Sequence, residues 1–365
     1  METLLYSIEE LIAFKVNFLH DIEKCKNKKE SSLNWLEHKL PIKSFLKNNE
    51  NFQIISFGGT NFITAEALYL DSKVKILSLK EGKVPLFDNK DHFLNFIINL
   101  INSEVKYISF AFAYPLLPSY TKDLLDGILI KSTKGNKFEG LIGKKIGEEI
   151  EKKIRNTFSK EIKVTVANDT VCACLAGINT YPKGSLISLV VGTGTNMAFF
   201  NNGSIINLES GNFDKLNRTE SGNYIDLNSL DPGHHIFEKE VSGAYLYKHY
   251  NYLISKLNLN YTEFKDSQEM NQALKDSKNV SFDLATMLIE RSASLVASQL
   301  AGLYEFKNKK TLNIITEGSM FWEGYRYKEF IEKYLFIFKI PKTTINFIKI
   351  DKSSLIGAEW LLFKI

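Results

Sequence analysis

Two glycine-rich turns constrain this chain most strongly, because each lies directly after a short apolar segment. Gly58-Gly59-Thr60-Asn61 follows Ile54-Ile55, and Gly192-Thr193-Gly194-Thr195-Asn196 follows residues 186–191. An apolar run that ends in a glycine turn and is followed by a second apolar run is typical of a β-hairpin. The sequence therefore predicts two hairpins with similar turns, more than a hundred residues apart.

The segments around the two turns begin with the same order of elements, three consecutive strands. Around the first turn, the apolar pattern predicts strands at 52–57, 62–70, 74–79 and 105–112 and a helix at 93–101. Further along, it predicts helices at 143–158, 168–177 and 282–306 and strands at 162–167, 186–191, 197–200, 205–206 and 312–316. Residues 1 to about 50 are expected to be helical, with a charged connector at 24–32. This order predicts an α/β protein whose two domains face each other across a cleft.

The composition fits a globular protein with two domains. Its 365 residues exceed the usual size of one compact core, and 44% of them are hydrophobic. The formal charge is only +4 and just four of the 46 basic residues are arginine, so no nucleic-acid partner is expected. Three cysteines offer no disulfide framework. The first apolar stretch carries charges and no run could cross a membrane, so we expect a cytoplasmic protein without a membrane partner.

Both glycine turns could hold phosphate groups. Without a Cβ, glycine lets backbone N–H groups approach phosphate oxygens, and the threonines in the turns could add hydroxyl donors. One glycine hairpin is more often ordinary turn chemistry, but two, each with Asn and an apolar strand after it, favour a shared function. Neither turn has the Gly-Lys-Ser/Thr of a P-loop or the spaced glycines of a dinucleotide-binding fingerprint.

Asp169 lies between the two turns, at the junction of the predicted strand 162–167 and the helix that follows. A carboxylate just past the end of a strand can accept the proton of an attacking hydroxyl group. Alternatively, Asn168 or Asp169 only caps the helix. The position alone does not decide between these interpretations, and the flanking glycine turns favour catalysis by a phosphotransferase.

Other polar residues could bind a substrate with many hydroxyl groups. Lys134, in the loop after 124–130, could orient a hydroxyl group or balance Asp169, although a solvated loop lysine is the default interpretation. Glu209 and Glu238 are in turn-rich segments, where carboxylates are usually surface residues, but a polyol needs paired acceptors. His234-His235 has no second pair of ligands at metal-binding spacing, so no metal site is predicted there.

Taken in order, these segments resemble the hexokinase family, a group within the actin-like sugar kinases, over about residues 52–358. Ser56–Phe62 and Gly192–Asn196 resemble its two phosphate segments, and Val166–Val171 matches the segment with its catalytic aspartate. The family's sugar-binding segments are similar to residues 112–115, 125–129, 133–135, 207–211 and 237–243. Residues 291–295 and 317–319 resemble its long helix and its adenosine segment.

The resemblance implies a two-domain actin-like ATPase (ribonuclease H-like) fold, with a mixed sheet flanked by helices in each domain. It places residues 51–167 and 350–365 in a small domain, and 1–50 and 168–349 in a large domain. The implied reaction is ATP-dependent phosphorylation of a hexose, foremost glucose, at the 6-hydroxyl, which admits the sugar to glycolysis. The implied partners are a hexose and ATP, with Mg²⁺ held mainly through the nucleotide and waters, and the implied assembly is a monomer or homodimer.

The resemblance also implies roles for individual residues. Asp169 would be the catalytic base. The sugar would be bound by Thr133, Lys134, Asn168, Asp169, Asn196, Glu209 and Glu238. The nucleotide would be bound by Gly58, Gly59, Thr60, Asn61, Gly192, Thr193, Gly194, Gly318 and Ser319. None of these residues would be a direct metal ligand.

Three positions depart from the family pattern. The family usually has an acidic residue, thought to hold the hydration shell of Mg²⁺, where this chain has Ser56, and a serine where it has Ala113. A tryptophan common beside the second glutamate segment is replaced by Ser210. These departures leave two alternatives to a hexokinase: a weak or inactive hexose-binding sensor on the same fold, or a kinase of a different sugar.

Overall fold

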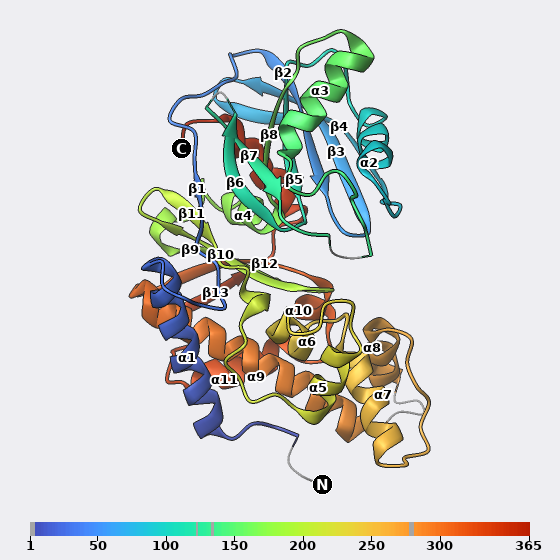
Figure 1. Ribbon diagram of the computed structural model, residues 1–365. Helices are drawn as coiled ribbons and strands as arrows, with labels where there is room; N and C mark the ends of the chain where they lie inside the picture. The colour runs from blue at the N-terminus through green and yellow to red at the C-terminus, as the bar shows by residue number, and fades with distance from the viewer. Residues whose placement is uncertain (1–3, 122, 133–134, 277–280) are drawn as a thin grey trace. The chain divides into compact units, whose positions relative to one another are not determined.

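The computed structural model describes residues 4–121, 123–132, 135–276 and 281–365 (Figure 1). The chain divides into two compact units. The β-rich unit comprises Leu36–Ser188, Ala198–Asn207 and Ile350–Ile365. The helix-rich unit comprises Met1–Trp35, Leu189–Met197 and Leu208–Lys349.

A five-stranded mixed sheet, in the order β4-β3-β2-β5-β8, forms the centre of the β-rich unit. Its strands are β2 (Glu50–Phe57), β3 (Asn61–Leu70), β4 (Lys73–Lys83), β5 (Tyr107–Phe112) and β8 (Lys163–Asn168). β2, β3 and β4 form an antiparallel meander, whereas β2, β5 and β8 are parallel. Phe57 pairs with Phe112 and Phe112 pairs with Asn168, so the three parallel strands end at the same edge of the sheet.

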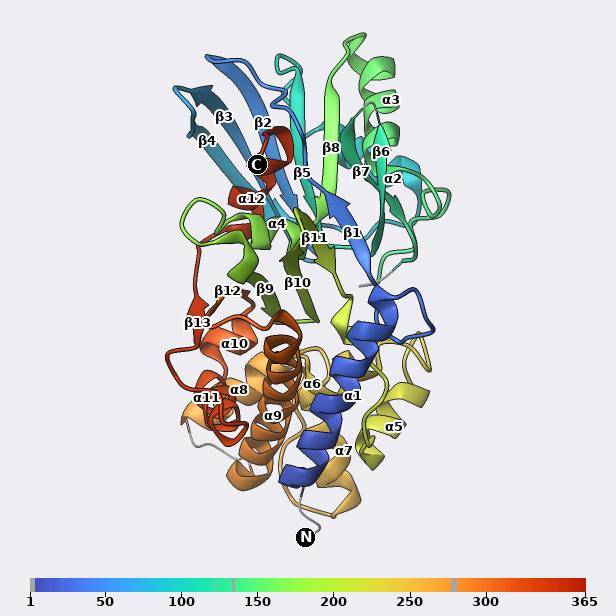
Figure 2. The same cartoon turned by 90° about the vertical axis from the view of Figure 1, so that its left-hand side faces the viewer.

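Helices cover both faces of this sheet (Figure 2). Because side chains alternate along a strand, Phe57 faces an aromatic core shared with α2 (Lys90–Ile98) and α3 (Ile146–Phe158). Ser56 points to the other face, where it contacts α12 (Ser353–Ala358). α12 packs in turn on α4 (Asp169–Leu175). The short elements η1 (Lys183–Ser185) and η3 (Glu359–Leu362) and a two-stranded ribbon of β6 (Leu116–Thr121) and β7 (Leu124–Leu129) complete this unit.

A six-stranded sheet has the order β1-β11-β10-β9-β12-β13, and its strands are divided between the two units. The strands are β1 (Leu36–Lys39), β9 (Leu186–Val191), β10 (Thr195–Asn201), β11 (Ser204–Asn207), β12 (Leu312–Glu317) and β13 (Ile345–Ile348). β11 is antiparallel to β1 and β10, whereas β12 and β13 are parallel. The second glycine turn joins β9 to β10.

The long helix α9 (Phe282–Lys307) organises the helix-rich unit, because α1 (Ile8–Lys26) and α11 (Tyr327–Ile337) both pack against it. Gly302 permits the close approach of α1, since a Cβ there would lie 3.1 Å from the carbonyl oxygen of Lys15. The remaining elements of this unit are α5 (Glu220–Leu227), α6 (Ile236–Val241), α7 (Leu246–Lys256), α8 (Ser267–Asp276), α10 (Ser319–Glu323) and η2 (Ser210–Asn212).

Most elements expected from the apolar pattern are present, including both hairpins. The expectation of a helical region from residue 1 to about 50 is wrong, because α1 ends at Lys26 and Leu36–Lys39 is a strand. In β1, buried Leu36 and His38 alternate with exposed Glu37 and Lys39, which is the period of a strand. Its pairing partner β11 lies far away in the sequence, so tertiary pairing decides the conformation of these four residues.

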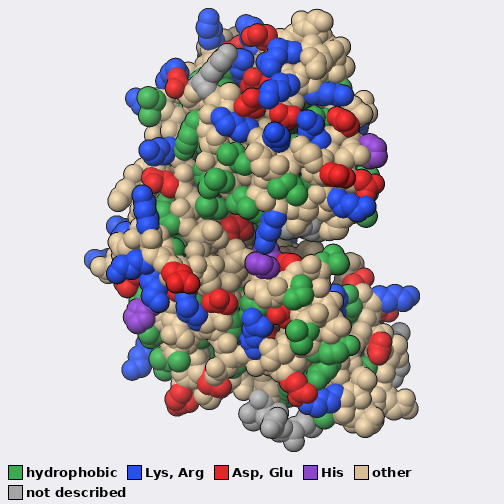
Figure 3. Space-filling view, viewed as in Figure 1, with side chains coloured by type: hydrophobic (Ala, Val, Ile, Leu, Met, Phe, Trp, Pro, Cys, Tyr) green, Lys and Arg blue, Asp and Glu red, His purple; other side chains and the backbone are tan. Residues whose placement is uncertain are grey.

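The surface carries charges of both signs. On the face shown in Figure 3, Lys and Arg side chains are interspersed with Asp and Glu. Among the residues that the structure describes, no helix is both long and apolar enough to cross a membrane.

Candidate active site

The first glycine turn joins β2 to β3 at the edge of the sheet where the parallel strands end. The N–H of Gly58 donates to the carbonyl oxygen of Asn61 over 2.9 Å, which closes the turn. A Cβ on Gly58 would lie 2.9 Å from that same oxygen, so only glycine fits here without a shift of the backbone. Thr60 and Asn61 are exposed at the tip. The turn therefore presents polar groups of residues 58–61 to solvent.

Asn168 ends β8 at the same edge of the sheet, and Asp169 follows it. Asn168 is the N-cap of α4, because its Oδ1 accepts a hydrogen bond from the N–H of Thr170 over 3.0 Å. Asp169 is half-buried, and its Oδ1 accepts from the same N–H over 2.7 Å. Since Asn168 already supplies the cap, the carboxylate of Asp169 is not required for that role.

Two buried residues are connected to Asn168: Tyr114 contacts it, and Asn136 contacts Tyr114. Neither was named among the predicted site residues. The hydroxyl group of Tyr114 accepts a hydrogen bond from Asn136 Nδ2 over 2.8 Å. The carbonyl oxygen of Tyr114 accepts from Asn168 Nδ2 over 3.3 Å. Burial raises the pKa of Tyr114, and the negative charge of Asp169 raises it further, so the phenol stays neutral. No local sequence signal marks Asn136, because its role depends on the fold.

Asn136 also makes a second buried hydrogen bond. Its Oδ1 accepts from the N–H of Phe87 over 2.8 Å, and its side chain is buried. The predicted sugar ligands Thr133 and Lys134, shortly before Asn136 in the sequence, lie outside the described residues.

Ser56 occupies the position where the family resemblance leads one to expect a carboxylate. It is buried, and its Oγ lies 2.9 Å from Oγ of Ser354 in α12, at hydrogen-bond distance. In the described part of the chain, no group of three or more His, Cys, Asp or Glu side chains could hold a metal ion. The polar groups at this edge of the five-stranded sheet are thus hydroxyl groups, backbone amides and the carboxylate of Asp169, which accepts hydrogen bonds.

The second glycine turn belongs to the helix-rich unit, where the predicted adenosine segment lies against it. A Cβ on Gly318 would overlap the carbonyl oxygen of Val191, and Gly318 has φ +109°, which favours glycine. The Cα of Gly318 lies 3.3 Å from where a Cβ of Gly192 would be. The structure therefore brings together the turn residues Gly192, Thr193 and Gly194 and the segment that contains Gly318 and Ser319.

Glu238, in α6, is attached to the same turn. Its Oε2 accepts a hydrogen bond from the N–H of Thr195 over 3.0 Å. A Cβ on Gly194 would lie 2.6 Å from that oxygen, and one on Gly211 would lie 3.2 Å from Cβ of Glu238. Glycine is therefore needed at position 194 to leave space for the carboxylate of Glu238, whatever Gly194 contributes to nucleotide binding.

Asn196, in the second glycine turn, holds the backbone directly after Glu209. Oδ1 of Asn196 accepts hydrogen bonds from the N–H groups of Met197, over 2.7 Å, and Ser210, over 3.1 Å. Glu209, directly before Ser210, adopts the left-handed conformation with φ +48°. Asn196, Glu209 and Glu238 are all half-buried. Together they offer carboxylate and amide groups that can hydrogen-bond to the hydroxyl groups of a ligand.

The architecture and these polar groups define a protein of the actin-like ATPase fold, which sugar kinases share. A hexokinase from Schistosoma mansoni solved with glucose superposes with a TM-score of 0.80 at 18% identity, covering 100% of this chain and 97% of that one. A glucokinase of the ROK family from Streptomyces griseus, solved with glucose and AMPPNP, gives a TM-score of 0.57 at 14% identity over 84% of this chain and 97% of that chain.

The sequence comparisons identify the family. Models described as "Hexokinase" match residues 7–178 and, in two overlapping segments, 186–258 and 249–362. The chain belongs to the hexokinase family.

The matched curated relatives are longer than this chain. The hexokinase of Plasmodium falciparum is 30% identical in an alignment of 295 residues that covers 66% of this chain and 58% of that protein. Hexokinase-1 of Arabidopsis thaliana is 26% identical in an alignment of 231 residues that covers 53% of this chain and 46% of that protein. The chain therefore spans about half the length of these relatives.

Proposed function

We propose that the protein transfers a phosphoryl group from ATP to the 6-hydroxyl of a hexose, foremost glucose. The observation that carries this proposal is the placement of Asp169. Its carboxylate follows a parallel strand, at the edge of the sheet with the first glycine turn, and Asn168 supplies the helix cap beside it. Family membership and the names of the relatives support the same reaction.

In this mechanism, Asp169 accepts the proton of the 6-hydroxyl as its oxygen attacks the terminal phosphate of ATP. A positioned base of this kind contributes about 10²- to 10⁴-fold to the rate. The neutral phenol of Tyr114 and the amide of Asn168 lie behind Asp169.

Two sets of residues would hold the sugar. We propose that Asn196, Glu209 and Glu238 hydrogen-bond to its hydroxyl groups, since carboxylate oxygens accept and the amide of asparagine can also donate. From the β-rich unit, Thr133, Lys134 and Asn168 would add donors. In the bound state these residues orient the hexose and keep water from replacing its 6-hydroxyl as the acceptor.

We propose that the two glycine turns and the segment with Gly318 and Ser319 bind ATP. Backbone N–H groups of residues 59–61 and 193–194 would contact phosphate oxygens, since those of Gly58 and Gly192 donate within their own turns. We propose that Mg²⁺ would be held mainly through phosphate oxygens of the nucleotide and through waters. When bound, the ion neutralises charge that develops on the transferred group.

The domain limits and cellular context are also proposals. We propose a small domain of residues 51–167 and 350–365 and a large domain of residues 1–50 and 168–349. A cytoplasmic location agrees with the three cysteines, all of which are buried and outside any disulfide. A monomer or a homodimer is the proposed assembly.

One alternative has a specific observation in its favour. Ser56 and Ala113 replace residues that the family pattern leads one to expect, and the hydroxyl group of Ser56 lies 2.9 Å from that of Ser354. A protein that binds a hexose without phosphorylating it would tolerate these changes.

A coupled assay of ADP release separates the two functions. Glucose, mannose, fructose, galactose and N-acetylglucosamine are each supplied with Mg-ATP, and melting temperature is recorded with every sugar. A kinase releases ADP and sugar phosphate in equal amounts with at least one of them. If a sugar raises the melting temperature but yields no product above a heat-killed control, the protein is a sensor. Product from galactose alone would indicate a kinase of a different sugar.

A further inference from the structure

Three consecutive residues of α6, Glu238, Lys239 and Glu240, have ionisable side chains, although this helix is almost entirely buried. Lys239 and Glu240 are each 1% exposed, whereas Glu238 is half-buried. Successive side chains on a helix point about 100° apart. The three side chains therefore point in three directions, and only Glu238 is directed at the second glycine turn.

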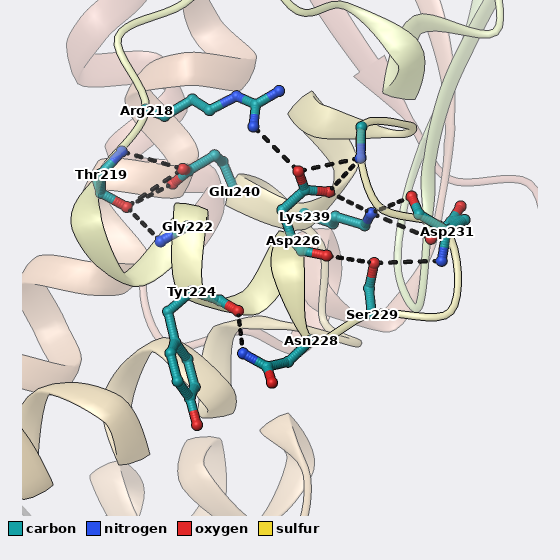
Figure 4. A network of polar contacts seen from close by, with 11 residues as sticks. Arg218, Thr219, Gly222, Tyr224, Asp226, Asn228, Ser229, Asp231, Lys239 and Glu240 are labelled. Atoms are coloured by element: carbon teal, nitrogen blue, oxygen red, sulfur yellow. Dashed lines mark hydrogen bonds and ion pairs between the residues drawn. The ribbon is translucent and has the colours of Figure 1, made fainter.

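The ammonium group of Lys239 is held by two aspartates (Figure 4). Its Nζ lies 2.7 Å from Oδ1 of Asp226 in α5, 3.1 Å from Oδ1 of Asp231 and 2.8 Å from the carbonyl oxygen of Asp231. Asp226 also accepts from Arg218 over 3.0 Å and from the N–H of Gly233. Burial alone would raise the pKa of Asp226, but these bonds outweigh it and lower the pKa, so the aspartate is ionised.

The neighbouring residue Glu240 is fixed on a different side. It accepts hydrogen bonds from the N–H and hydroxyl group of Thr219 (Figure 4). Its Oε2 also lies 3.2 Å from Nη2 of Arg291 in α9. The backbone of Lys239 is held as well, because Nε2 of His249 lies 2.9 Å from its carbonyl oxygen. Burial lowers the pKa of His249 well below its usual value, so the neutral ring donates this hydrogen bond.

Contacts with other elements fix the orientation of α6. The helix has only six residues, and His235 before it adopts the left-handed conformation and supplies no side-chain cap. So short a helix is not stable alone, and its position comes from tertiary contacts. The N–H of Phe237 donates to the carbonyl oxygen of Phe213 over 3.0 Å, and the hydroxyl group of Ser292 donates to the carbonyl oxygen of Val241 over 2.7 Å. The hydrogen bonds at Lys239 and Glu240 add side-chain constraints on the rotation of the helix between these two ends.

We propose that Lys239 is a positioning residue for the carboxylate of Glu238. The pairing of its ammonium group with Asp226 and Asp231 fixes the rotation of α6 at which Oε2 of Glu238 meets the N–H of Thr195. This proposal rests on the proposed function in one respect, the role of Glu238 as a sugar ligand. A buried ion cluster is poor evidence for stability, because apolar side chains of similar volume often stabilise equally well. Its directional hydrogen bonds are what such side chains cannot replace.

The test is a double-mutant cycle on glucose binding, with Lys239→Met and Glu238→Gln singly and together. Methionine keeps the length and burial of the side chain but cannot bind the aspartates. In this variant Asp226 retains Arg218 and Gly233, and the side chain of Asp231, which is 38% exposed, can be solvated instead. The matched control is Lys333→Met, which removes an exposed lysine that pairs with Glu290 over 2.6 Å. Isothermal calorimetry gives the Kd for glucose, and steady-state kinetics give KM and kcat.

We expect Lys239→Met to raise the Kd and KM for glucose about tenfold, with a smaller effect on the KM for ATP. In the Glu238→Gln background, Lys239→Met should change the Kd by less than about twofold, because its effect passes through the carboxylate. The control should bind glucose as the wild-type protein does. Wild-type affinity in folded Lys239→Met, or a tenfold effect that persists in the Glu238→Gln background, would overturn the proposal.

Two further outcomes keep the conclusions separate. If Lys239→Met does not fold, Asp231→Asn replaces it in the cycle, since that side chain is 38% exposed and contributes one contact to the ammonium group. An unchanged Kd for Asp231→Asn would then overturn the proposal, and a raised Kd that depends on Glu238 would support it. If wild-type protein binds no hexose of the panel, the proposed function fails. If Glu238→Gln binds glucose normally, only the role of Glu238, and with it that of Lys239, is overturned.

Discussion

Among single residues, Glu359 shows how burial alone changes the chemistry of a side chain. This carboxyl group lies at the start of η3, and burial raises its pKa to about 7. In the unfolded chain the group ionises at about 4.5, the value for an exposed glutamate. Between these two pH values the unfolded chain releases a proton that the folded protein keeps. The free energy of unfolding therefore falls as the pH rises, by up to about 3 kcal/mol.

Glu359→Gln should remove this pH dependence, because an amide does not ionise. At pH 8 we expect the variant to be about 1–3 kcal/mol more stable than the wild-type protein. At pH 4.5 the two should differ little, since the carboxyl group is then protonated in the folded protein and half-protonated in the unfolded chain. Urea unfolding at both pH values measures this difference. A stability difference of the same size at both values would contradict the explanation.

Asn136 is a second residue whose role depends on burial. Its side chain joins the hydroxyl group of Tyr114 to the N–H of Phe87. Asn136→Ala leaves both groups buried without that partner, so we expect a loss of about 2 kcal/mol or more in the free energy of unfolding. The KM for the hexose should also rise, because the proposed ligands Thr133 and Lys134 lie shortly before Asn136 in the sequence.

Urea unfolding and steady-state kinetics test this prediction. The matched control is Asn156→Ala, at an exposed position of α3, which should change neither quantity measurably. Equal effects of the two substitutions would show that the contacts of Asn136 contribute nothing specific.

At the scale of helices and strands, local patterns predicted what local forces determine. The hairpin of β2 and β3 was predictable because alternating apolar residues and the turn at Gly58 both favour it. β1 and α6 were not, since Leu36–Lys39 is a strand only through its pairing with β11, and Ile236–Val241 is held by ion pairs with distant residues. Tertiary contacts determine such short elements, and the sequence around them carries no sign of their partners.

The contact between α12 and α4 is an element-scale feature that a single methyl group would disturb. A Cβ on Gly357 in α12 would overlap the carbonyl oxygen of Cys172 in α4. Gly357→Ala should therefore lower the free energy of unfolding by about 1–3 kcal/mol, despite the higher helix propensity of alanine. It should also lower kcat, because α4 begins at Asp169.

Ile356→Ala is the matched control for this contact, since Ile356 is the preceding residue of α12 and is 36% exposed. Urea unfolding of both variants decides the matter. Gly357→Ala with a stability equal to or above that of the wild-type protein would show that α12 and α4 can separate at no cost.

For the whole molecule, the order of motifs along the chain predicted the family and fold, and the fold explains part of the site. Residues 58–61, Asn168 and Asp169 lie at the same edge of the five-stranded sheet because its parallel strands end there. The contact of Glu238 with the second glycine turn was not predictable, because it depends on the side chain of one element and the missing Cβ of Gly194 in another. Nor could the pairing of Ser56 with Ser354 be predicted, since 298 residues separate them.

The measurement that tests the central claim most directly compares the wild-type protein with Asp169→Asn at saturating Mg-ATP and glucose. Asparagine keeps the shape of the side chain but cannot accept the proton. We predict a fall in kcat of about 10²- to 10⁴-fold, with a Kd for glucose within about threefold of the wild-type value. Asp283→Asn, at an exposed position in the first turn of α9, should retain full activity. Two results would contradict the claim that Asp169 is the base of a hexose kinase. One is turnover by Asp169→Asn close to that of the wild-type protein, and the other is wild-type protein that binds glucose without releasing ADP.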